Sequence, residues 1–508
     1  MKRSCIAVWS LFFLASCASR GHLYVPYVYG DLVDGFDTSL QSGYHRELGN
    51  PIIEHKDGNL SSTYSSLYND GTRFVLPSLG EQKLLVIPVD FEESPGEKGQ
   101  LPIISTAFFG QTGNNEFPSV ADYYDHSSYG RLHIRGKVAE GFHRCSYSLG
   151  QLSTVQGSRK SKEALTKIYR EALSWYDQTF PEDPSSNYAF SDGKGHTVVP
   201  VYLIYNAPYS GLNGEVSNRD SMMWAFTIND PAPVSWSSYS MLSVNGKVDS
   251  HTCIHESGHL FGIPDYYDIS GASTNEYSPL GRADMMDCSL GDHNPFTKYL
   301  LGWVKPYVVD SNSTVTLRPF ASSGDCLILG SEGENPYEEY VLLCYYTQGG
   351  LNYFDSVLRT DETMKMMPSS GIVAYKVDAR LGVFPTGISS PVGYFGYESD
   401  LSGRSIGLFA NNSYGRSVEG GYASSALVRM LSSDHGDVIP SHFVASNQTK
   451  TVVQGETEIH LQDVIFGVGE GIGNAPLTSL SFPSGKKLSA TFKVGKLNPT
   501  YAEIAVKK

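Results

Sequence analysis

Residues 255–265 read HESGHLFGIPD, and this short stretch decides how the rest of the chain is interpreted. Residues four apart lie on one face of a helix, so His255 and His259 can direct their imidazoles to one metal ion. Glu256 lies one step round the helix, where its carboxylate can act on a water molecule at that ion. The stretch therefore predicts a helix over residues 250–260, with Ser250 as its N-cap, that carries a metal centre.

The continuation of the motif supplies a third ligand. Gly262 follows the second histidine by three residues, and a glycine there permits a sharp, left-handed turn out of the helix. The chain can then double back and bring Asp265, an oxygen donor suited to Zn²⁺, to the same ion. We predict that His255, His259 and Asp265 hold zinc. The competing interpretation is a buried helix whose histidines are satisfied by hydrogen bonds.

A second motif follows the third ligand. Residues 284–287 read DMMD, about twenty residues further on, where proteins with this extended zinc motif carry a methionine turn beneath the metal. Such a turn gives the histidines an apolar floor. We predict that Met286 is the turn methionine, with Met285 as the alternative. An ordinary core methionine is the competing interpretation, since methionine fills irregular gaps well.

These motifs carry a family resemblance. HESGHLFGIPDYYD, then DMMD, then PFTKYLLGW at residues 295–303 resemble the immune inhibitor A family of bacterial zinc metallopeptidases, which have a metzincin-type zinc motif. The resemblance implies a zinc endopeptidase that hydrolyses peptide bonds of proteins. It extends from about residue 83 to about residue 380, because further segments match in the same order: LLVIPVDF, VADYYDHSSYGRL, EYVLLCYY, GLNYFDSVL and GIVAYKVDAR.

One position departs from that pattern. Several metzincins place a tyrosine two residues after the turn methionine, where it stabilises the oxyanion, and this chain has Cys288 there. The oxyanion-stabilising residue is therefore unassigned. His251, four residues before His255, is expected to be a surface or N-cap residue, with a supporting contact to the metal ligands as the alternative. The candidates for the oxyanion are Tyr266, Tyr267, Tyr277, His293 and Tyr299.

The N-terminus has the pattern of an export signal. Lys2 and Arg3 precede an apolar stretch, residues 6–14, that is too short to span a bilayer. The stretch ends in Leu-Ala-Ser-Cys, which resembles the bacterial lipobox, so we expect cleavage before Cys17 and lipidation of that cysteine. The expected location is extracellular, at the cell surface, as a bacterial lipoprotein. The alternative is an ordinary signal peptide with an incidental cysteine.

The remaining sequence predicts four segments: a signal peptide (1–17), a tether or inhibitory pro-segment (18–80), a catalytic domain (81–305) and a β-rich C-terminal region (306–508). We expect an α/β (α+β) zincin-like catalytic domain followed by sandwich-type β domains. Cys326 and Cys344 flank one candidate hairpin and could pair if their geometry allows a disulfide. Strands are expected over residues 83–91, 132–138, 198–205, 222–228, 313–317, 339–346, 371–377, 456–461 and 487–494, and further helices over 119–126 and 158–176.

Composition limits the partners. The 508 residues include 38 Lys and Arg and 53 Asp and Glu, a net charge of −15, which argues against nucleic-acid binding. We expect protein or peptide substrates and a membrane contact through the N-terminal lipid. The acidic turn at residues 192–195 and the acids near residue 268 suit Ca²⁺ as well as solvent, and we favour solvent. The competing functions are a catalytically weak surface adhesin, and a binding module whose C-terminal aromatic loops hold the main role.

Overall fold

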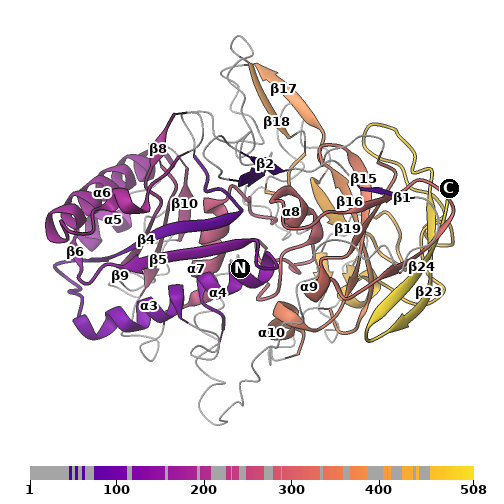
Figure 1. Ribbon diagram of the computed structural model, residues 1–508, viewed down its shortest axis with the longest axis horizontal. Coiled ribbons are helices and arrows are strands. Elements are labelled where there is room, and N and C mark those ends of the chain that lie inside the picture. Colours follow the sequence, from indigo (N-terminus) through magenta and orange to yellow (C-terminus); the bar gives the residue numbers. More distant parts are fainter. Residues whose placement is uncertain are drawn as a thin grey trace.

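The computed structural model places the chain in two sheet-containing regions with helices on and between them (Figure 1). No described helix is both long and apolar enough to cross a bilayer. Cys17, most of the tether or pro-segment, and Cys288 lie outside the described residues, so the expectations about them stay predictions. The structure describes residues 45–47, 52–54, 60–62, 74–110, 117–154, 158–191, 195–207, 225–229, 232–239, 248–267, 279–287, 289–331, 336–357, 367–385, 404–408, 410–413, 426–438, 442–444 and 458–508.

The first sheet is mixed, with four parallel strands and one antiparallel edge strand in the order β10-β11-β9-β4-β5. β10 runs antiparallel to β11, and the short β6 continues the pairing of β4 beyond β5. The strands span β4 Gly80–Asp90, β5 Leu132–Val138, β6 His143–Arg144, β9 Val201–Asn206, β10 Phe226–Ile228 and β11 Val234–Tyr239.

Helices cover both faces of this sheet, and that explains why β4 is apolar on both sides. Leu85 and Ile87 pack in one hydrophobic cluster with helix α6 (Ser158–Thr179). Leu84 and Val86 face the other way, into a second cluster. That cluster also contains residues of α3 (Leu101–Phe109), α4 (Val120–Ser127) and α7 (Ser250–Leu260), the helix of the HESGH motif.

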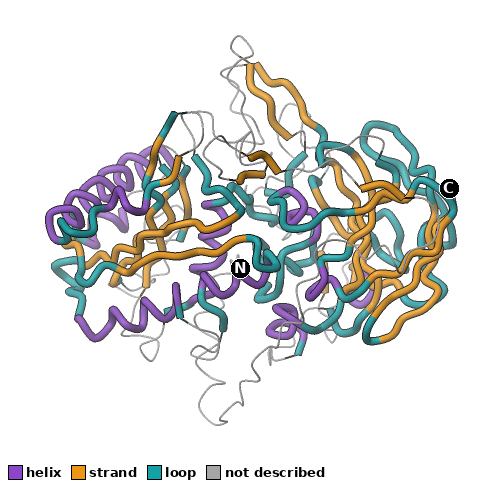
Figure 2. The backbone as a smooth tube through the Cα atoms, viewed as in Figure 1, coloured by secondary structure: helices purple, strands orange, loops and turns teal. Residues whose placement is uncertain are grey.

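Besides two short two-stranded sheets, the C-terminal region contains two larger sheets (Figure 2). One has the order β1-β12-β14-β15-β16-β19, with β22 also paired to β16, and the other is β13-β24-β23. Their strands are β1 His45–Glu47, β12 Tyr307–Val309, β14 Cys326–Leu329, β15 Glu339–Tyr346, β16 Gly371–Asp378, β19 Val428–Met430, β22 Ile465–Phe466, β13 Ser313–Leu317, β23 Thr491–Asn498 and β24 Tyr501–Lys507.

Short elements make the remaining connections. Helix α8 directly follows the loop after the DMMD turn, and α9 and α10 lie between the two regions (Figure 1). The bounds are α5 Leu149–Thr154, α8 Pro295–Leu300, α9 Phe320–Ser323, α10 Tyr353–Ser356, β2 Ile52–Glu54, β3 Leu60–Ser62, β7 Phe190–Ser191, β8 Thr197–Val198, β17 Leu381–Pro385, β18 Arg404–Leu408, β20 His442–Val444 and β21 Glu458–His460, with 3-10 turns η2 Lys98–Gln100, η3 Ser185–Tyr188, η4 Gly350–Asn352 and η5 Leu461–Val464.

One hydrophobic cluster joins the two regions. Ile328, Leu342 and Tyr375 on one face of the larger C-terminal sheet belong to the same cluster as Ile254 of α7. The cluster extends along the chain from Val75 to Ile465. It therefore crosses both residue 80 and residue 305, where we place segment boundaries from the sequence. Those boundaries stay predictions, but the predicted catalytic domain and the β-rich C-terminal region share one hydrophobic cluster.

The opposite face of that sheet has its own core. Leu327, Leu343 and Ala374 cluster with Phe492 and Ile504 of the three-stranded sheet. Strands β14, β15 and β16 are thus buried on both faces, which accounts for their nearly uninterrupted apolar sequences. Cys326 and Cys344 are directly opposed across β14 and β15, and both are free thiols.

The mixed α/β character expected from the sequence is confirmed, and β5, β13, β15 and α7 have the predicted bounds. Two details differ. Asp249, not Ser250, caps α7, because the Asp249 carboxylate accepts the backbone N–H of His251 at 3.1 Å. The strand expected over residues 198–205 begins at Val201, after Pro200, whose nitrogen has no proton to donate to a ladder.

The shared cluster predicts that the two regions unfold together. Residues 74–508 should show one cooperative thermal transition, because cutting before β12 divides the hydrophobic cluster that α7 shares with the larger C-terminal sheet. A chain of residues 74–305 should therefore be insoluble, or lack a cooperative transition, in calorimetry. A soluble 74–305 fragment with its own sharp transition would contradict this prediction.

Candidate metal centre

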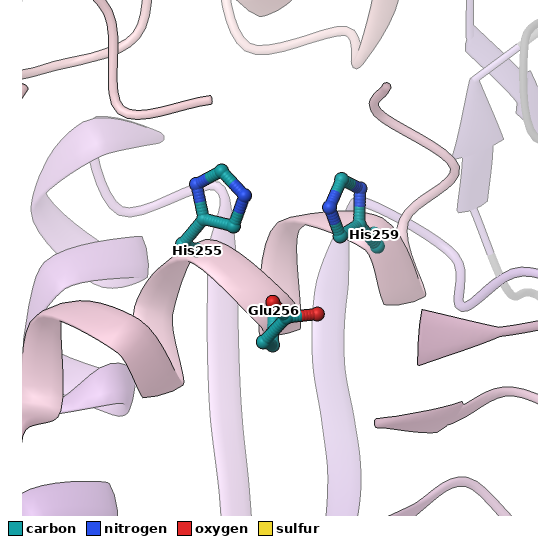
Figure 3. A group of neighbouring side chains, drawn as sticks. All are labelled: His255, Glu256 and His259. Atoms are coloured by element: carbon teal, nitrogen blue, oxygen red, sulfur yellow. The ribbon is translucent and has the colours of Figure 1, made fainter. Parts of the chain in front are cut away.

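Helix α7 presents its two histidines on one face and ends in a tight turn. His255 and His259 extend side by side from this face, with Glu256 on an adjacent side of the helix (Figure 3). Gly262 follows the helix with φ +80°, a conformation that glycine adopts without steric cost. The N–H of Gly262 donates to the His259 carbonyl at 3.0 Å. This turn redirects the chain so that Asp265 returns to the imidazoles.

The three predicted metal ligands converge. The Oδ1 atom of Asp265 lies 3.0 Å from Nε2 of His255 and 3.4 Å from Nε2 of His259. His255 is buried, whereas His259 and Asp265 are partly exposed, so the meeting point of the three atoms lies near the protein surface. The arrangement offers two imidazole nitrogens and one carboxylate oxygen, a donor set that suits Zn²⁺.

Backbone carbonyls fix the orientation of both rings. Nδ1 of His255 lies 2.9 Å from the Met285 carbonyl oxygen, and Nδ1 of His259 lies 2.6 Å from that of Ile263. A carbonyl only accepts, so Nδ1 carries the proton in each ring and Nε2 of the neutral imidazole holds a lone pair. Three acceptor atoms then face one another, and they need positive charge among them, either protons or a metal ion. Metal-binding histidines are oriented by the same kind of contact.

The electrostatics of the site favour that positive charge. Burial alone would lower the pKa of His259, but the Asp265 carboxylate outweighs it and raises this pKa to about 9. Burial is the largest single influence on His255 and lowers its pKa, but the hydrogen bond to Asp265 and the negative charge of that carboxylate together outweigh it and raise the pKa. Burial works against the charge on Asp265, yet the two histidines hold its pKa well below the usual range. The site therefore stabilises the negative charge of Asp265 together with positive charge on or between the two histidines.

Glu256 lies beside this point in a buried position. Its carboxylate and the ligand nitrogens of His255 and His259 all lie within 4.8 Å of one another. The side chain is 2% exposed, and burial raises its pKa above that of an ordinary glutamate. Such a group accepts a proton more readily than a solvent-exposed carboxylate does. Its position suits a general base.

The DMMD segment forms a turn against α7. A Cβ atom at Gly258 would overlap the sulfur of Met286, so glycine at this position lets the turn approach the helix. The Met286 carbonyl accepts the N–H of Tyr266 at 2.8 Å, and the Met285 carbonyl orients His255 as described. Met286 thus packs against the helix between the two histidine positions, and its role as the turn methionine stays a prediction.

A buried carboxylate holds this turn in place. Asp284 is 0% exposed, and its Oδ1 accepts the N–H of Met286 at 2.8 Å. Its Oδ2 accepts the N–H and the side-chain amide of Asn294, at 2.6 and 2.8 Å. One carboxylate therefore ties the methionine turn to the start of α8.

The candidate residues for stabilising the oxyanion differ in burial and in their distance from the predicted metal ligands. The Tyr267 ring stacks on that of His255, with centroids 6.5 Å apart and an interplanar angle of 30°, and the side chain is partly exposed. Tyr266 is buried, and its hydroxyl pairs with Thr297. His293 and Tyr299 are fully buried as well, and His293 contacts aromatic rings rather than the ligands. Tyr277 lies outside the described residues, so Tyr267 is the described candidate beside a ligand.

His251 does not have the expected position. We predict a surface or N-cap residue from the sequence, but His251 is 5% exposed and its Nε2 lies 2.9 Å from the Ser289 carbonyl oxygen. The reason is that the loop after the methionine turn covers this end of α7. Asp355 of α10 anchors that loop by accepting the N–H of Leu290 at 2.9 Å.

Several contacts of the site have no local sequence signal. Ser413 donates a hydrogen bond of 2.7 Å to the main-chain oxygen of Asp265 across 148 residues of sequence. Thr227 and Ser235, on β10 and β11, both contact Glu256. Each is an ordinary hydroxyl residue in its own segment, and only the tertiary fold brings it to the motif.

Comparisons with known proteins add no family assignment: neither the scan against family models nor the search of curated proteins gives a match. The residues and geometry of this site are therefore the basis for assigning a function.

The role of Asp284 predicts a large stability effect. Asp284→Asn should lower the free energy of unfolding by about 2–3 kcal/mol, because an amide NH₂ would replace an acceptor that faces buried donors. Urea denaturation measures this change. The matched control is Asp434→Asn at an exposed position, which should change the free energy by no more than about 0.5 kcal/mol. Equal effects of the two substitutions would contradict the anchoring role.

Proposed function

We propose that the chain is a zinc metalloendopeptidase that hydrolyses peptide bonds of proteins. The observation that carries this proposal is the convergence of His255, His259 and Asp265 on one point, with both imidazoles oriented by carbonyls and Glu256 alongside. The resemblance of the motifs to the immune inhibitor A family supports the same conclusion. Under this proposal the first sheet and its helices form a zincin-type catalytic unit, and the C-terminal sheets form a sandwich.

The residues of the site can divide the chemistry among them. His255, His259 and Asp265 would hold Zn²⁺, which lowers the pKa of a bound water to about 7 and polarises the scissile carbonyl. Glu256 takes a proton from the water as its oxygen attacks the carbonyl carbon. Glu256 then delivers that proton to the amine nitrogen as the C–N bond breaks. Its buried setting keeps the carboxylate competent for both transfers.

The edge strand β10 supports an extended peptide as substrate. Among the described strands, β10 pairs with β11 on one side and ends the sheet on the other, and its Thr227 contacts Glu256. A peptide that adds to a sheet edge is held by main-chain hydrogen bonds, which any sequence can supply. This placement would bring the scissile bond to the general base. It favours a protein substrate over a small molecule.

The proposal includes a location. Export and lipidation at Cys17 would hold the enzyme at the bacterial cell surface, and residues 18–80 would serve as tether or inhibitory pro-segment. Protein substrates and the membrane are then the partners.

Removing the general base should abolish turnover without disturbing the ligands. Glu256→Ala should keep its zinc and its fold and lose about 10²–10⁴-fold in the rate of casein digestion. Zinc analysis and circular dichroism check the first two points. The matched control is Glu163→Ala on the exposed side of α6, which should digest casein at the wild-type rate. Digestion by Glu256→Ala at the wild-type rate would refute the catalytic assignment.

Removing the third ligand should affect the metal instead. Asp265→Ala should bind less zinc per chain than wild type after dialysis against a competing chelator, because two imidazoles alone leave the set incomplete. Asp268→Ala, three residues further along, is the control and should keep its zinc. The same zinc affinity in both variants would remove Asp265 from the set of ligands.

A further inference from the structure

Two hydroxyl groups of the sheet meet at Glu256. Thr227 of β10 and Ser235 of β11 are directly paired in the register of the two strands, so both side chains lie on the same face of the sheet. Their oxygens are 2.6 Å apart. Ser235 is fully buried, and Thr227 is partly buried. This face of the sheet is the one that packs on α7, so the pair lies beneath the helix at the level of the general base.

The two hydroxyl groups contact both the main-chain oxygen and the carboxylate of Glu256. Ser235 Oγ lies 2.9 Å from the main-chain oxygen of Glu256. Thr227 Oγ1 lies 2.9 Å from the same oxygen and 3.1 Å from Oε2 of the carboxylate. Each hydroxyl has a single proton to donate. The 2.6 Å contact between the two oxygens takes one of these protons, so when Thr227 donates to the carboxylate, Ser235 donates to Oγ1 of Thr227.

We propose that the Thr227–Ser235 hydroxyl pair is a positioning device for Glu256 in the peptidase reaction. Ser235 orients the hydroxyl of Thr227, and Thr227 fixes one carboxylate oxygen, which leaves the other oxygen to face water and substrate. The proposal rests on the proposed function. It adds two positioning residues from a segment that the zinc motif does not include.

The chemistry of a hydroxyl suits this task better than that of an amide or ammonium group. A threonine hydroxyl donates to a carboxylate and accepts from a carboxylic acid. The contact with Thr227 can therefore persist when Glu256 takes the proton of the water and when it gives that proton to the amine. A donor-only group would hold the charged form alone.

The simpler alternative is that the pair only attaches the helix to the sheet. That role would be served by the two contacts with the main-chain oxygen, and it predicts loss of stability without a specific loss of turnover. The contact of Thr227 with Oε2 distinguishes the two roles, because it touches the reacting group. The decisive measurement must therefore separate turnover from folding and from metal binding.

The test compares Thr227→Val, Thr227→Ser and the control Thr166→Val. Thr166 lies on α6, where its hydroxyl bonds the Lys162 carbonyl, so this control makes the same chemical change away from the site. With a fluorogenic peptide, Thr227→Val should lose about 10–100-fold in kcat, a size typical of lost supporting contacts. KM and zinc stoichiometry should stay at the wild-type values. Thr227→Ser should restore most of kcat, and Thr166→Val should match wild type.

Melting temperatures of the zinc-free proteins give a second readout that does not depend on activity. Thr227→Val should lower the melting temperature less in a Glu256→Ala background than in wild type, because the carboxylate contact is already lost there. If Thr227→Val does not fold, Thr227→Ala removes the hydroxyl without adding a methyl group in its place and carries the same expectations.

Two results would overturn the inference. One is a wild-type kcat in Thr227→Val. The other is a loss of rate that is not specific to the hydroxyl contact, seen either as a Thr227→Ser variant as impaired as Thr227→Val or as a loss of zinc that accounts for the loss of rate. Failure of the proposed function is a separate result: wild-type protein would then show no zinc-dependent proteolysis that Glu256→Ala removes.

Discussion

Two imidazoles can face one carboxylate oxygen productively only if each ring has its other nitrogen occupied by a fixed acceptor. This constraint explains much of the local structure. The Ile263 carbonyl meets it for His259 through the turn at Gly262, and the Met285 carbonyl meets it for His255 through the turn that Asp284 holds. Both turns lie within about thirty residues of the helix, yet each depends on packing from elsewhere. Buried polar groups that are fully hydrogen-bonded in this way specify one arrangement of a core.

The C-terminal region is part of that packing. Its larger sheet shares a hydrophobic cluster with α7, Asp355 anchors the loop that covers His251, and Ser413 bonds the main chain of Asp265. A region that only bound other molecules would not need such contacts with the predicted metal site. The geometry instead makes the β-rich half a structural support for the site, whatever it binds on its outer surfaces.

The sequence predicts the site far better than it predicts what supports it. Helical periodicity and one glycine are sufficient to place His255, Glu256, His259 and Asp265, because these residues interact across a single helix and turn. Buried strands such as β15 can be predicted equally well, because burial on both faces requires a continuous run of apolar residues. The prediction that His251 is a surface or N-cap residue was wrong, because the loop after the methionine turn covers its side chain. Thr227, Ser235 and Ser413 were not foreseen, because a hydroxyl residue carries no local sign of a partner far along the chain.

The long-range bond between Ser413 and Asp265 also has a consequence for timing. Chains are made from the N-terminus at about 5–20 residues per second, and domains fold as the chain emerges. The 148 residues between Asp265 and its partner therefore correspond to roughly 7–30 s of synthesis at the rates just given. During that interval the histidine helix exists without the strands and the serine that complete its surroundings. A nascent or prematurely terminated chain that ends before Ser413 thus lacks one of the contacts that hold the main chain of Asp265.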